Sequence, residues 1–209
     1  MNGIEAIMRL APVIPVLVID EVDYARPIAE ALVAGGLCAL EVTLRTQAAL
    51  DAIREMAKVE GAIVGAGTVL NEADLKASLE AGARFIVSPG LSEPLGKAAI
   101  SSGIPFLPGI ATATDIMRGL EMGLNRFKFF PATAIGGIPA LRALAAPFPQ
   151  CRFCPTGGIT QATAPDWLAL EAVLCVGGSW LVPRGRPDAV AITKAARNAG
   201  TCSRERITL

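Results

Sequence analysis

The sequence alternates short apolar segments with helical ones along almost its whole length, and this alternation constrains the fold more than any other feature. Each apolar segment has the length and bounding turns of a buried strand, and residues with helical periodicity follow it. The eight expected strands cover residues 13–19, 37–43, 62–68, 85–88, 105–108, 123–132, 152–155 and 173–177. A short helix over residues 4–10 is expected before them. Thr46 is expected to cap a helix that runs through Lys58, and Asn71 a helix that reaches Gly82.

This repeat predicts one α/β domain over residues 1–209, because no linker or change of composition separates two halves. Eight parallel strands in a continuous βα repeat favour a closed (β/α)8 barrel, the TIM barrel. A doubly wound open sheet is the alternative on pattern alone. In a barrel of this kind, the active site lies at the carboxyl ends of the strands.

The composition argues against several classes of function. The chain has 19 basic residues, 19 acidic residues and no histidine, so its formal net charge is +0. No basic patch is present to bind nucleic acid or an anionic membrane, and prolines and glycines break the longest uncharged stretches. Without histidine, His-based catalysis and His-ligated metal sites are excluded within this chain. We therefore expect no metal, no cofactor, no nucleic acid and no membrane partner.

The cysteines indicate a reducing compartment. Cys38, Cys154 and Cys175 lie in apolar, strand-like runs, where a thiol behaves as a small hydrophobic group. Cys151 and Cys154 have C-x-x-C spacing, but this run enters a strand, in which positions three apart point to opposite faces. The N-terminal residues also lack the pattern of a secretory signal. These observations predict a cytoplasmic protein in which Cys151 and Cys154 are not a redox pair.

Lys128 is the candidate nucleophile, because it stands inside an aromatic run of the sixth expected strand. Alternation places Arg126, Lys128 and Phe130 on one face of the strand and Phe127 and Phe129 on the other. Lysine is rarely buried without a reason, since burial penalises a charged amine. A neutral amine in a closed pocket is a nucleophile for a ketone.

Polar residues gather at the expected carboxyl ends of the strands. Glu41 and Thr43 lie near the end of the second strand, Thr68 ends the third, and Pro89 follows the fourth in a Ser-Pro-Gly turn. Arg45 shares strand parity with Glu41, so both face the barrel mouth if the strand extends that far. The sequence therefore predicts that these side chains surround the same opening as Lys128.

Each of these residues also has a purely structural interpretation. Glu41 is either a general acid/base or the partner of Lys128 or Arg45 in a salt bridge. Arg45 either lies on the surface or binds a substrate carboxylate with its two-pronged guanidinium. Thr68 either ends its strand or assists at that carboxylate, and Pro89 shapes a turn.

Two glycine pairs follow the last two expected strands, in Thr156-Gly-Gly and Gly-Gly-Ser179. Glycine lets the backbone approach an oxyanion, and the loops after strands seven and eight of such barrels often bind phosphate. A substrate that suits all these groups has a ketone for Lys128, a carboxylate near Arg45, a hydroxyl for Glu41 and a distal phosphate. The residues thus point to a phosphorylated 2-keto acid sugar, cleaved at a carbon–carbon bond through an imine.

The sequence closely resembles 2-keto-3-deoxy-6-phosphogluconate (KDPG) aldolase and the related 4-hydroxy-2-oxoglutarate aldolases. The motifs that carry the resemblance span nearly the whole chain and read EVTLRT from Glu41, VGAGTVLN from Val64, SPG from Ser88, FKFFPA from Phe127, PTGGI from Pro155 and GGSWLVP from Gly177. The resemblance implies a class I, metal-independent aldolase on a (β/α)8 barrel, usually a homotrimer. It implies cleavage of 2-dehydro-3-deoxy-6-phosphogluconate to pyruvate and glyceraldehyde 3-phosphate in the Entner–Doudoroff route. Some members also cleave 4-hydroxy-2-oxoglutarate to pyruvate and glyoxylate.

The resemblance also implies roles for single residues. Lys128 would be the Schiff-base lysine and Glu41 the acid/base. The substrate-binding residues that it implies are Arg45 and Thr68 for the carboxylate, Pro89 and Phe130 for the pyruvate pocket, and Thr156, Gly157, Gly158, Gly178 and Ser179 for the distal hydroxyls and phosphate. The segment after Pro183 is shorter than the connection often found in the family.

Three rival functions remain open on the sequence. The first is the sister aldolase for 2-dehydro-3-deoxy-6-phosphogalactonate, which would use the same lysine and differ in stereochemistry at C4. The second is a phosphosugar isomerase or epimerase barrel with no covalent step. The third is a phosphosugar-binding protein without catalysis.

Overall fold

The strands form two curled, fully parallel sheets in the computed structural model, which describes residues 3–202 of the chain. The first sheet has six strands in the order β5-β4-β3-β2-β1-β9, and the second has three in the order β6-β7-β8. The strands are β1 (Val13–Leu17), β2 (Ala39–Thr43), β3 (Ile63–Gly67), β4 (Phe85–Val87), β5 (Phe106–Leu107), β6 (Gly109–Ile110), β7 (Arg126–Phe129), β8 (Arg152–Pro155) and β9 (Val176–Gly178). The predicted α/β class with a parallel sheet is confirmed.

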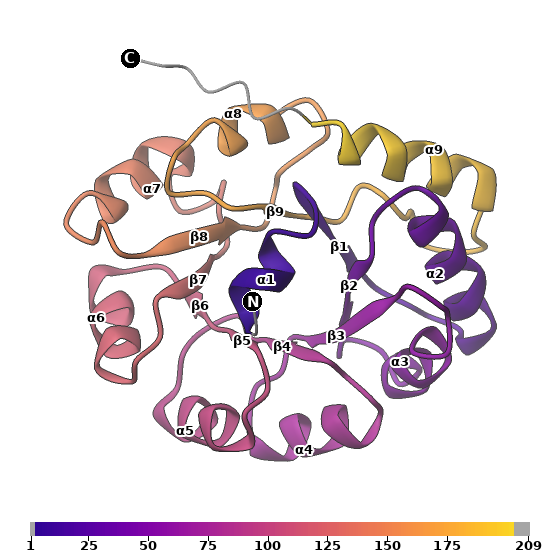
Figure 1. Cartoon of the computed structure of the whole chain (residues 1–209), viewed down its shortest axis with the longest axis horizontal. Coiled ribbons are helices and arrows are strands. Elements are labelled where there is room, and N and C mark those ends of the chain that lie inside the picture. Colours follow the sequence, from indigo (N-terminus) through magenta and orange to yellow (C-terminus); the bar gives the residue numbers. More distant parts are fainter. Residues whose placement is uncertain (1–2, 203–209) are drawn as a thin grey trace.

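The helices surround the strands, as Figure 1 shows, except that the first lies across the middle of the ring. They are α1 (Ile4–Met8), the 3-10 helix η1 (Val22–Tyr24), α2 (Ala25–Ala34), α3 (Ala49–Met56), α4 (Glu72–Glu80), α5 (Glu93–Ser102), α6 (Ala113–Glu121), α7 (Gly137–Ala145), α8 (Ala164–Leu168) and α9 (Ala189–Gly200). No helix in residues 3–202 combines the length and the apolar character needed to cross a membrane.

The two sheets meet at two places. The strand expected over residues 105–108 is observed as β5, and β6 follows it after Pro108. Carbonyl groups of this segment accept hydrogen bonds from both sheets. The Leu107 carbonyl accepts from the Ser88 N–H, and the Pro108 carbonyl accepts from the Lys128 N–H. At the other seam, isolated parallel bridges pair Phe153 with Val173 and Thr156 with Gly177.

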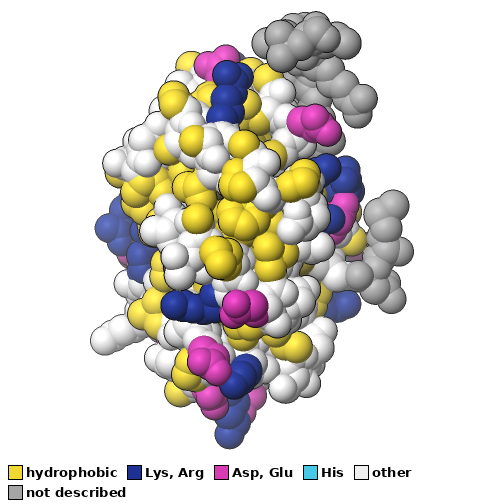
Figure 2. Space-filling view, turned by 90° about the vertical axis from the view of Figure 1, so that its left-hand side faces the viewer, with side chains coloured by type: hydrophobic (Ala, Val, Ile, Leu, Met, Phe, Trp, Pro, Cys, Tyr) yellow, Lys and Arg dark blue, Asp and Glu magenta, His cyan; other side chains and the backbone are white. Residues whose placement is uncertain are grey.

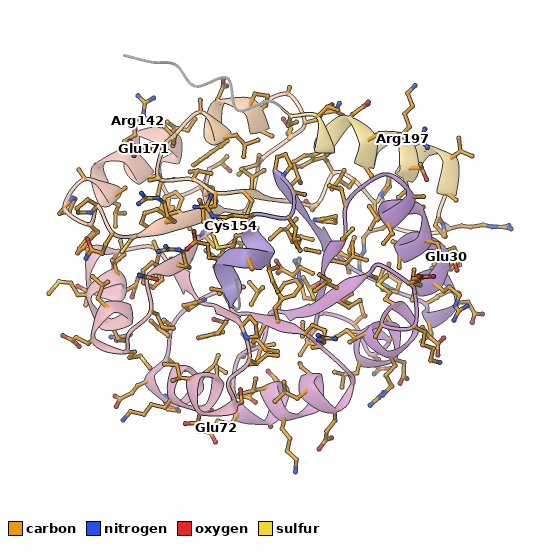
Figure 3. All side chains as sticks on the ribbon, in the orientation of Figure 1. Glu30, Glu72, Arg142, Cys154, Glu171 and Arg197 are labelled. Atoms are coloured by element: carbon orange, nitrogen blue, oxygen red, sulfur yellow. The ribbon has the colours of Figure 1, made fainter. Side chains whose placement is uncertain are left out.

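Two hydrophobic cores result from the alternation of side chains along the strands. The larger core lies between the strands and the outer helices and contains Phe127, Phe129 and Cys151. The smaller core fills the ring and contains Cys154 together with Ile7 and Met8 of α1. Cys151 and Cys154 thus lie on opposite faces, as predicted. In Figure 3, Cys154 lies inside the ring, whereas the labelled charged residues lie toward its outside.

Helix α1 is attached to the ring by Arg126 as well as by apolar packing. The Arg126 guanidinium donates to Glu5 Oε2 over 2.9 Å from Nε and 2.6 Å from Nη2. Hydrogen bonds from Arg9 and then Arg126 lower the pKa of Glu5 below its ordinary value. A carboxyl group whose pKa is lowered by folding stabilises the fold above its unfolded pKa, and this contribution disappears as the pH falls through the folded value.

One predicted helix cap is confirmed and another is wrong. The Asn71 side chain accepts from the Asp74 N–H and caps α4, as predicted. Thr46 was expected to cap the following helix, but α3 begins at Ala49. The Thr46 hydroxyl donates instead to the Ile19 carbonyl, so it links the loop after β2 to the end of β1. This long-range acceptor is not visible in the local sequence pattern.

Candidate active site

The site is centred on two charged side chains that point into the ring from opposite sides of it. Lys128 lies on β7, and its neighbours Phe127 and Phe129 pack in the outer core, so alternation turns Lys128 inward. Glu41 lies on β2 beside Val16 of β1 and Gly65 of β3. The predicted facing of the aromatic run is therefore confirmed.

The two side chains are in contact and almost fully buried. Lys128 Nζ donates to Glu41 Oε1 over 3.0 Å, and the side chains are only 6% and 4% exposed. Nζ also lies 5.3 Å from the centre of the Phe130 ring, which gives the ammonium a cation–π contact. An amine must lose a proton before it attacks a ketone, and Glu41 is the group within reach to accept it.

Arg45 does not share this environment. Strand β2 ends at Thr43, whose buried hydroxyl donates to the Leu17 carbonyl over 2.8 Å. Arg45 follows in a turn and is exposed, so the parity argument that turned it inward with Glu41 does not apply. The salt bridge of Glu41 is made with Lys128 and not with Arg45. Arg45 nevertheless lies at the edge of the sheet where β2 and β3 end, because the Leu44 N–H bonds the Gly67 carbonyl.

Thr68 has an unusual backbone conformation at the end of β3. Its φ of 61° is the only positive value of a non-glycine residue in residues 3–202. A β-branched residue rarely adopts this conformation, and such strain gathers at functional sites. Thr68 is half-buried and directly follows the last residue of β3.

The turn after β4 lies against β6. Ser88 is buried, and its hydroxyl donates to the Gly90 carbonyl across the half-buried Pro89. A Cβ added to Gly109 would stand 2.1 Å from the Pro89 carbonyl oxygen. Since Gly109 pairs with Lys128, the absence of a side chain there brings Pro89 close to the strand that carries the lysine.

The two glycine loops are neighbours at the ends of β8 and β9. Gly157 and Gly158 have φ values of 106° and 76°, which favour glycine. Thr156 is buried and forms the bridge to Gly177, while Ser179 is exposed. Gly178 is buried against the Trp180 ring, which a Cβ would meet at 2.4 Å.

The segment beyond Pro183 reaches back to the first strand. The Arg184 guanidinium donates to Asp20 over 2.7 Å, and both side chains are largely exposed. This ion pair joins the loop after β1 to the connection after β9, at the departure from the family pattern noted in the sequence.

Two contacts near the site were not predicted from the sequence. The Thr133 hydroxyl donates to the Gly157 carbonyl over 3.0 Å, so the loop after β7 supports the first glycine loop. Gly67 lies directly beneath the Glu41 carboxylate, and a Cβ there would stand 2.2 Å from Oε1. The sequence signal for Gly67 was two glycines at alternate positions of a strand. Within residues 3–202, no three or more Cys, Asp or Glu side chains come together in a way that could hold a metal ion.

Known proteins resemble this chain over nearly its full length. The family model for KDPG and KHG aldolase matches residues 4–195. The 2-dehydro-3-deoxy-phosphogluconate aldolase of Zymomonas mobilis is 58% identical over 98% of both chains. The KHG/KDPG aldolase of Escherichia coli K12 is 57% identical over 93% of both. A solved KDPG aldolase from Legionella pneumophila, with pyruvate captured at low pH as a covalent carbinolamine, is 44% identical, covers 96% of this chain and 99% of its own, and superposes with a TM-score of 0.92.

Proposed function

The chain belongs to the KDPG and KHG aldolase family and is a class I aldolase for 2-dehydro-3-deoxy-6-phosphogluconate, and we propose that Lys128 is its Schiff-base lysine and Glu41 its acid/base. The observation that carries this assignment is the buried 3.0 Å contact between Lys128 Nζ and Glu41 Oε1. The pair stands inside a ring of parallel strands, near the ends where loops of this architecture hold substrates. The reaction is the closing step of the Entner–Doudoroff route.

The contact suits both halves of a retro-aldol reaction. Glu41 accepts a proton from Lys128 as the amine attacks the C2 ketone, and it returns that proton to the departing hydroxyl, so that loss of water from the carbinolamine gives an iminium ion. The iminium draws in the electrons of the C3–C4 bond while Glu41, directly or through a water, removes the proton of the C4 hydroxyl. Glyceraldehyde 3-phosphate then leaves. The enamine takes a proton at C3, and hydrolysis returns the free amine and pyruvate.

The remaining residues are assigned by their places around the mouth. Arg45 and Thr68 hold the pyruvate carboxylate, since they follow the adjacent strands β2 and β3. Pro89 and Phe130 line the pyruvate pocket. The residues assigned to the distal hydroxyls and phosphate are Thr156, Gly157, Gly158, Gly178 and Ser179, which belong to the two neighbouring glycine loops.

We infer that the two sheets work as one closed (β/α)8 barrel in a single domain. The segment over residues 106–110 supplies a strand to each sheet, and isolated bridges join β8 to β9. A closed arrangement leaves no sheet edge, and it turns Lys128 and Glu41 toward each other across the interior. Because Cys38, Cys151, Cys154 and Cys202 form no disulfide, we also place the enzyme in the reducing cytoplasm.

The stereochemistry at C4 separates this function from its nearest rival. We expect faster cleavage of the 6-phosphogluconate-derived substrate than of its galactonate epimer, by at least about tenfold in kcat/KM. That ratio corresponds to ~1.4 kcal/mol of transition-state binding. A coupled assay of pyruvate release from both epimers, with 4-hydroxy-2-oxoglutarate as a third substrate, measures it. Faster cleavage of the galactonate epimer would overturn the assignment. An isomerase or a binding protein would release no pyruvate from any of the three substrates.

We further propose that the enzyme is a homotrimer that associates through the face carrying α7. Figure 2 shows hydrophobic side chains gathered on the side of the molecule where α6 and α7 lie. Helix α7 has nine residues, yet Leu141 is its only buried one and Arg142 its only charged one. Met117 of α6 is 54% exposed. Apolar surface of this kind marks an interaction site.

A charge placed on this face tests the interface. Ala143→Asp on α7 is expected to weaken the trimer by at least about 100-fold in its dissociation constant, since an unpaired buried charge costs several kcal/mol. Ala73→Asp on α4 is the matched control, because Ala73 is also an exposed helical alanine. Sedimentation across a range of concentrations measures both variants. An intact Ala143→Asp trimer, or equal weakening by the control, would place the interface elsewhere.

A further inference from the structure

Strand β3 has only glycines on its inner face near the site, and side chains of the neighbouring strands occupy the space above them. Gly65 and Gly67 are the inward positions beside Glu41 and Thr43 of β2. A Cβ on Gly65 would stand 2.4 Å from the Phe85 ring of β4. A Cβ on Gly67 would stand 2.2 Å from Oε1, 2.6 Å from Cγ and 2.8 Å from Cδ of Glu41. The acid/base therefore lies across β3 with its whole carboxyl end over Gly67.

We propose that Gly67 is a positioning residue for the aldol chemistry, because its bare Cα lets the Glu41 carboxylate lie across β3 and reach Lys128. This inference rests on the proposed function, since it assigns a support to the proposed acid/base. Gly67 has no side chain that could take part in the chemistry. It acts through the place that it leaves for another side chain.

Backbone conformation does not require glycine at this position. Gly67 is not among the glycines with positive φ, and it lies in a regular strand whose residues pair with β2 in register. Any residue adopts such a backbone. The requirement is one of space, and the group that needs the space is the Glu41 carboxylate rather than an apolar side chain.

The backbone of β2 at Glu41 is held in place by the packing of its neighbours. Its neighbours Val42 and Leu40 are fully buried on the outer face, so the backbone of β2 cannot slide without disturbing the outer core. A methyl group at position 67 would therefore be accommodated by rotation of the Glu41 side chain. Rotation moves Oε1 away from its 3.0 Å contact with Lys128. A misplacement of ~1 Å at a catalytic group can cost about 100-fold in rate.

The test compares Gly67→Ala with Gly65→Ala. Both add one methyl group to the inner face of the same strand, but the second meets the Phe85 ring and not Glu41. We expect Gly67→Ala to lower kcat by about 100-fold with KM changed by less than about threefold, because the groups that bind substrate are untouched. Gly65→Ala is expected to lose stability while keeping kcat per folded enzyme within about threefold of the parent.

A second pair of variants tests the same contact, with kcat expressed per folded site so that poor folding of Gly67→Ala does not mask the result. Glu41→Asp shortens the side chain by one methylene, so it withdraws the carboxylate from Lys128 and also from the space above Gly67. The double variant Glu41→Asp/Gly67→Ala should therefore lose less kcat than the two single variants would lose if their fold-reductions multiplied. Losses that multiply, or equal effects of Gly65→Ala and Gly67→Ala on kcat, would overturn the proposal.

Reductive trapping separates this inference from the assignment on which it rests. Borohydride added with pyruvate should form an adduct on Lys128 in the parent and in both glycine variants. The amount of adduct gives the concentration of folded sites, by which each measured rate is divided to obtain kcat. A parent enzyme that forms no adduct would refute the Schiff-base assignment itself. A parent that forms the adduct, together with a Gly67→Ala variant that cleaves normally, would refute only the role of Gly67.

Discussion

Replacing Lys128 with alanine is expected to abolish cleavage, with turnover reduced by on the order of 10⁴-fold or more. The covalent path requires an amine at C2, and the variant has none within the buried site. Pyruvate release in a coupled assay measures the loss. Mass mapping after borohydride reduction with pyruvate should find the adduct on Lys128 in the parent and no adduct in the variant.

The stability of the Lys128→Ala variant needs its own control. Removal of one partner from a buried ion pair costs about 3–5 kcal/mol, because the Glu41 carboxylate is left without its donor. The double variant Lys128→Met/Glu41→Gln removes both charges and should recover much of the free energy of unfolding without recovering turnover. Residual cleavage near the parent rate, or an adduct mapped to another lysine, would contradict the assignment of Lys128.

Replacing Glu41 with glutamine is expected to separate imine formation from bond cleavage. The amide keeps the shape of the side chain and can still accept a hydrogen bond from Lys128, but it cannot take up a proton. Cleavage should fall by roughly 10²–10⁴-fold, which is the usual contribution of a general acid/base. Borohydride should still trap pyruvate on Lys128, although more slowly. Exchange of the pyruvate methyl protons in D2O should fall in parallel with cleavage.

Glu93→Gln is the matched control for this variant. Glu93 lies exposed on α5, where it pairs with Lys97, so its loss should leave both turnover and trapping unchanged. Equal trapping and equal cleavage in Glu41→Gln and the parent would refute the acid/base role. That outcome would return the contact of Glu41 with Lys128 to the structural salt bridge that the sequence also allowed.

The strands and the central lysine were predictable because their signals are local. Alternation along a strand turns Lys128 inward once Phe127 and Phe129 face the helices, and no distant information is needed. Thr46 was misjudged for the opposite reason. A threonine before an apolar helix resembles a cap, but its acceptor is the Ile19 carbonyl, which lies 27 residues away.

Contacts across the ring also could not be derived from the sequence. The position of Gly67 beneath Glu41 depends on the register of β2 with β3, and the reach of Glu41 to Lys128 depends on closure between strands 87 residues apart. The exposure of Arg45 depends on where β2 stops, which the apolar pattern does not define to the residue. In each case the residue type was informative but the sequence left the contact open, as it did between Lys128 and Arg45 for Glu41.

The placement of α1 across the ring has a kinetic consequence. Ile7 and Met8 fill the interior at that end, and Arg126 fastens the helix through Glu5, so on the proposed function reactants exchange at the opposite opening. On the proposed assignment, the three-carbon unit attached to Lys128 lies at the closed end of this chamber, and the phosphorylated aldehyde lies nearer the exit. The products therefore depart in a fixed sequence, aldehyde first and pyruvate second. In the direction of synthesis, pyruvate must enter before any aldehyde, and an aldehyde that arrives first blocks its own reaction.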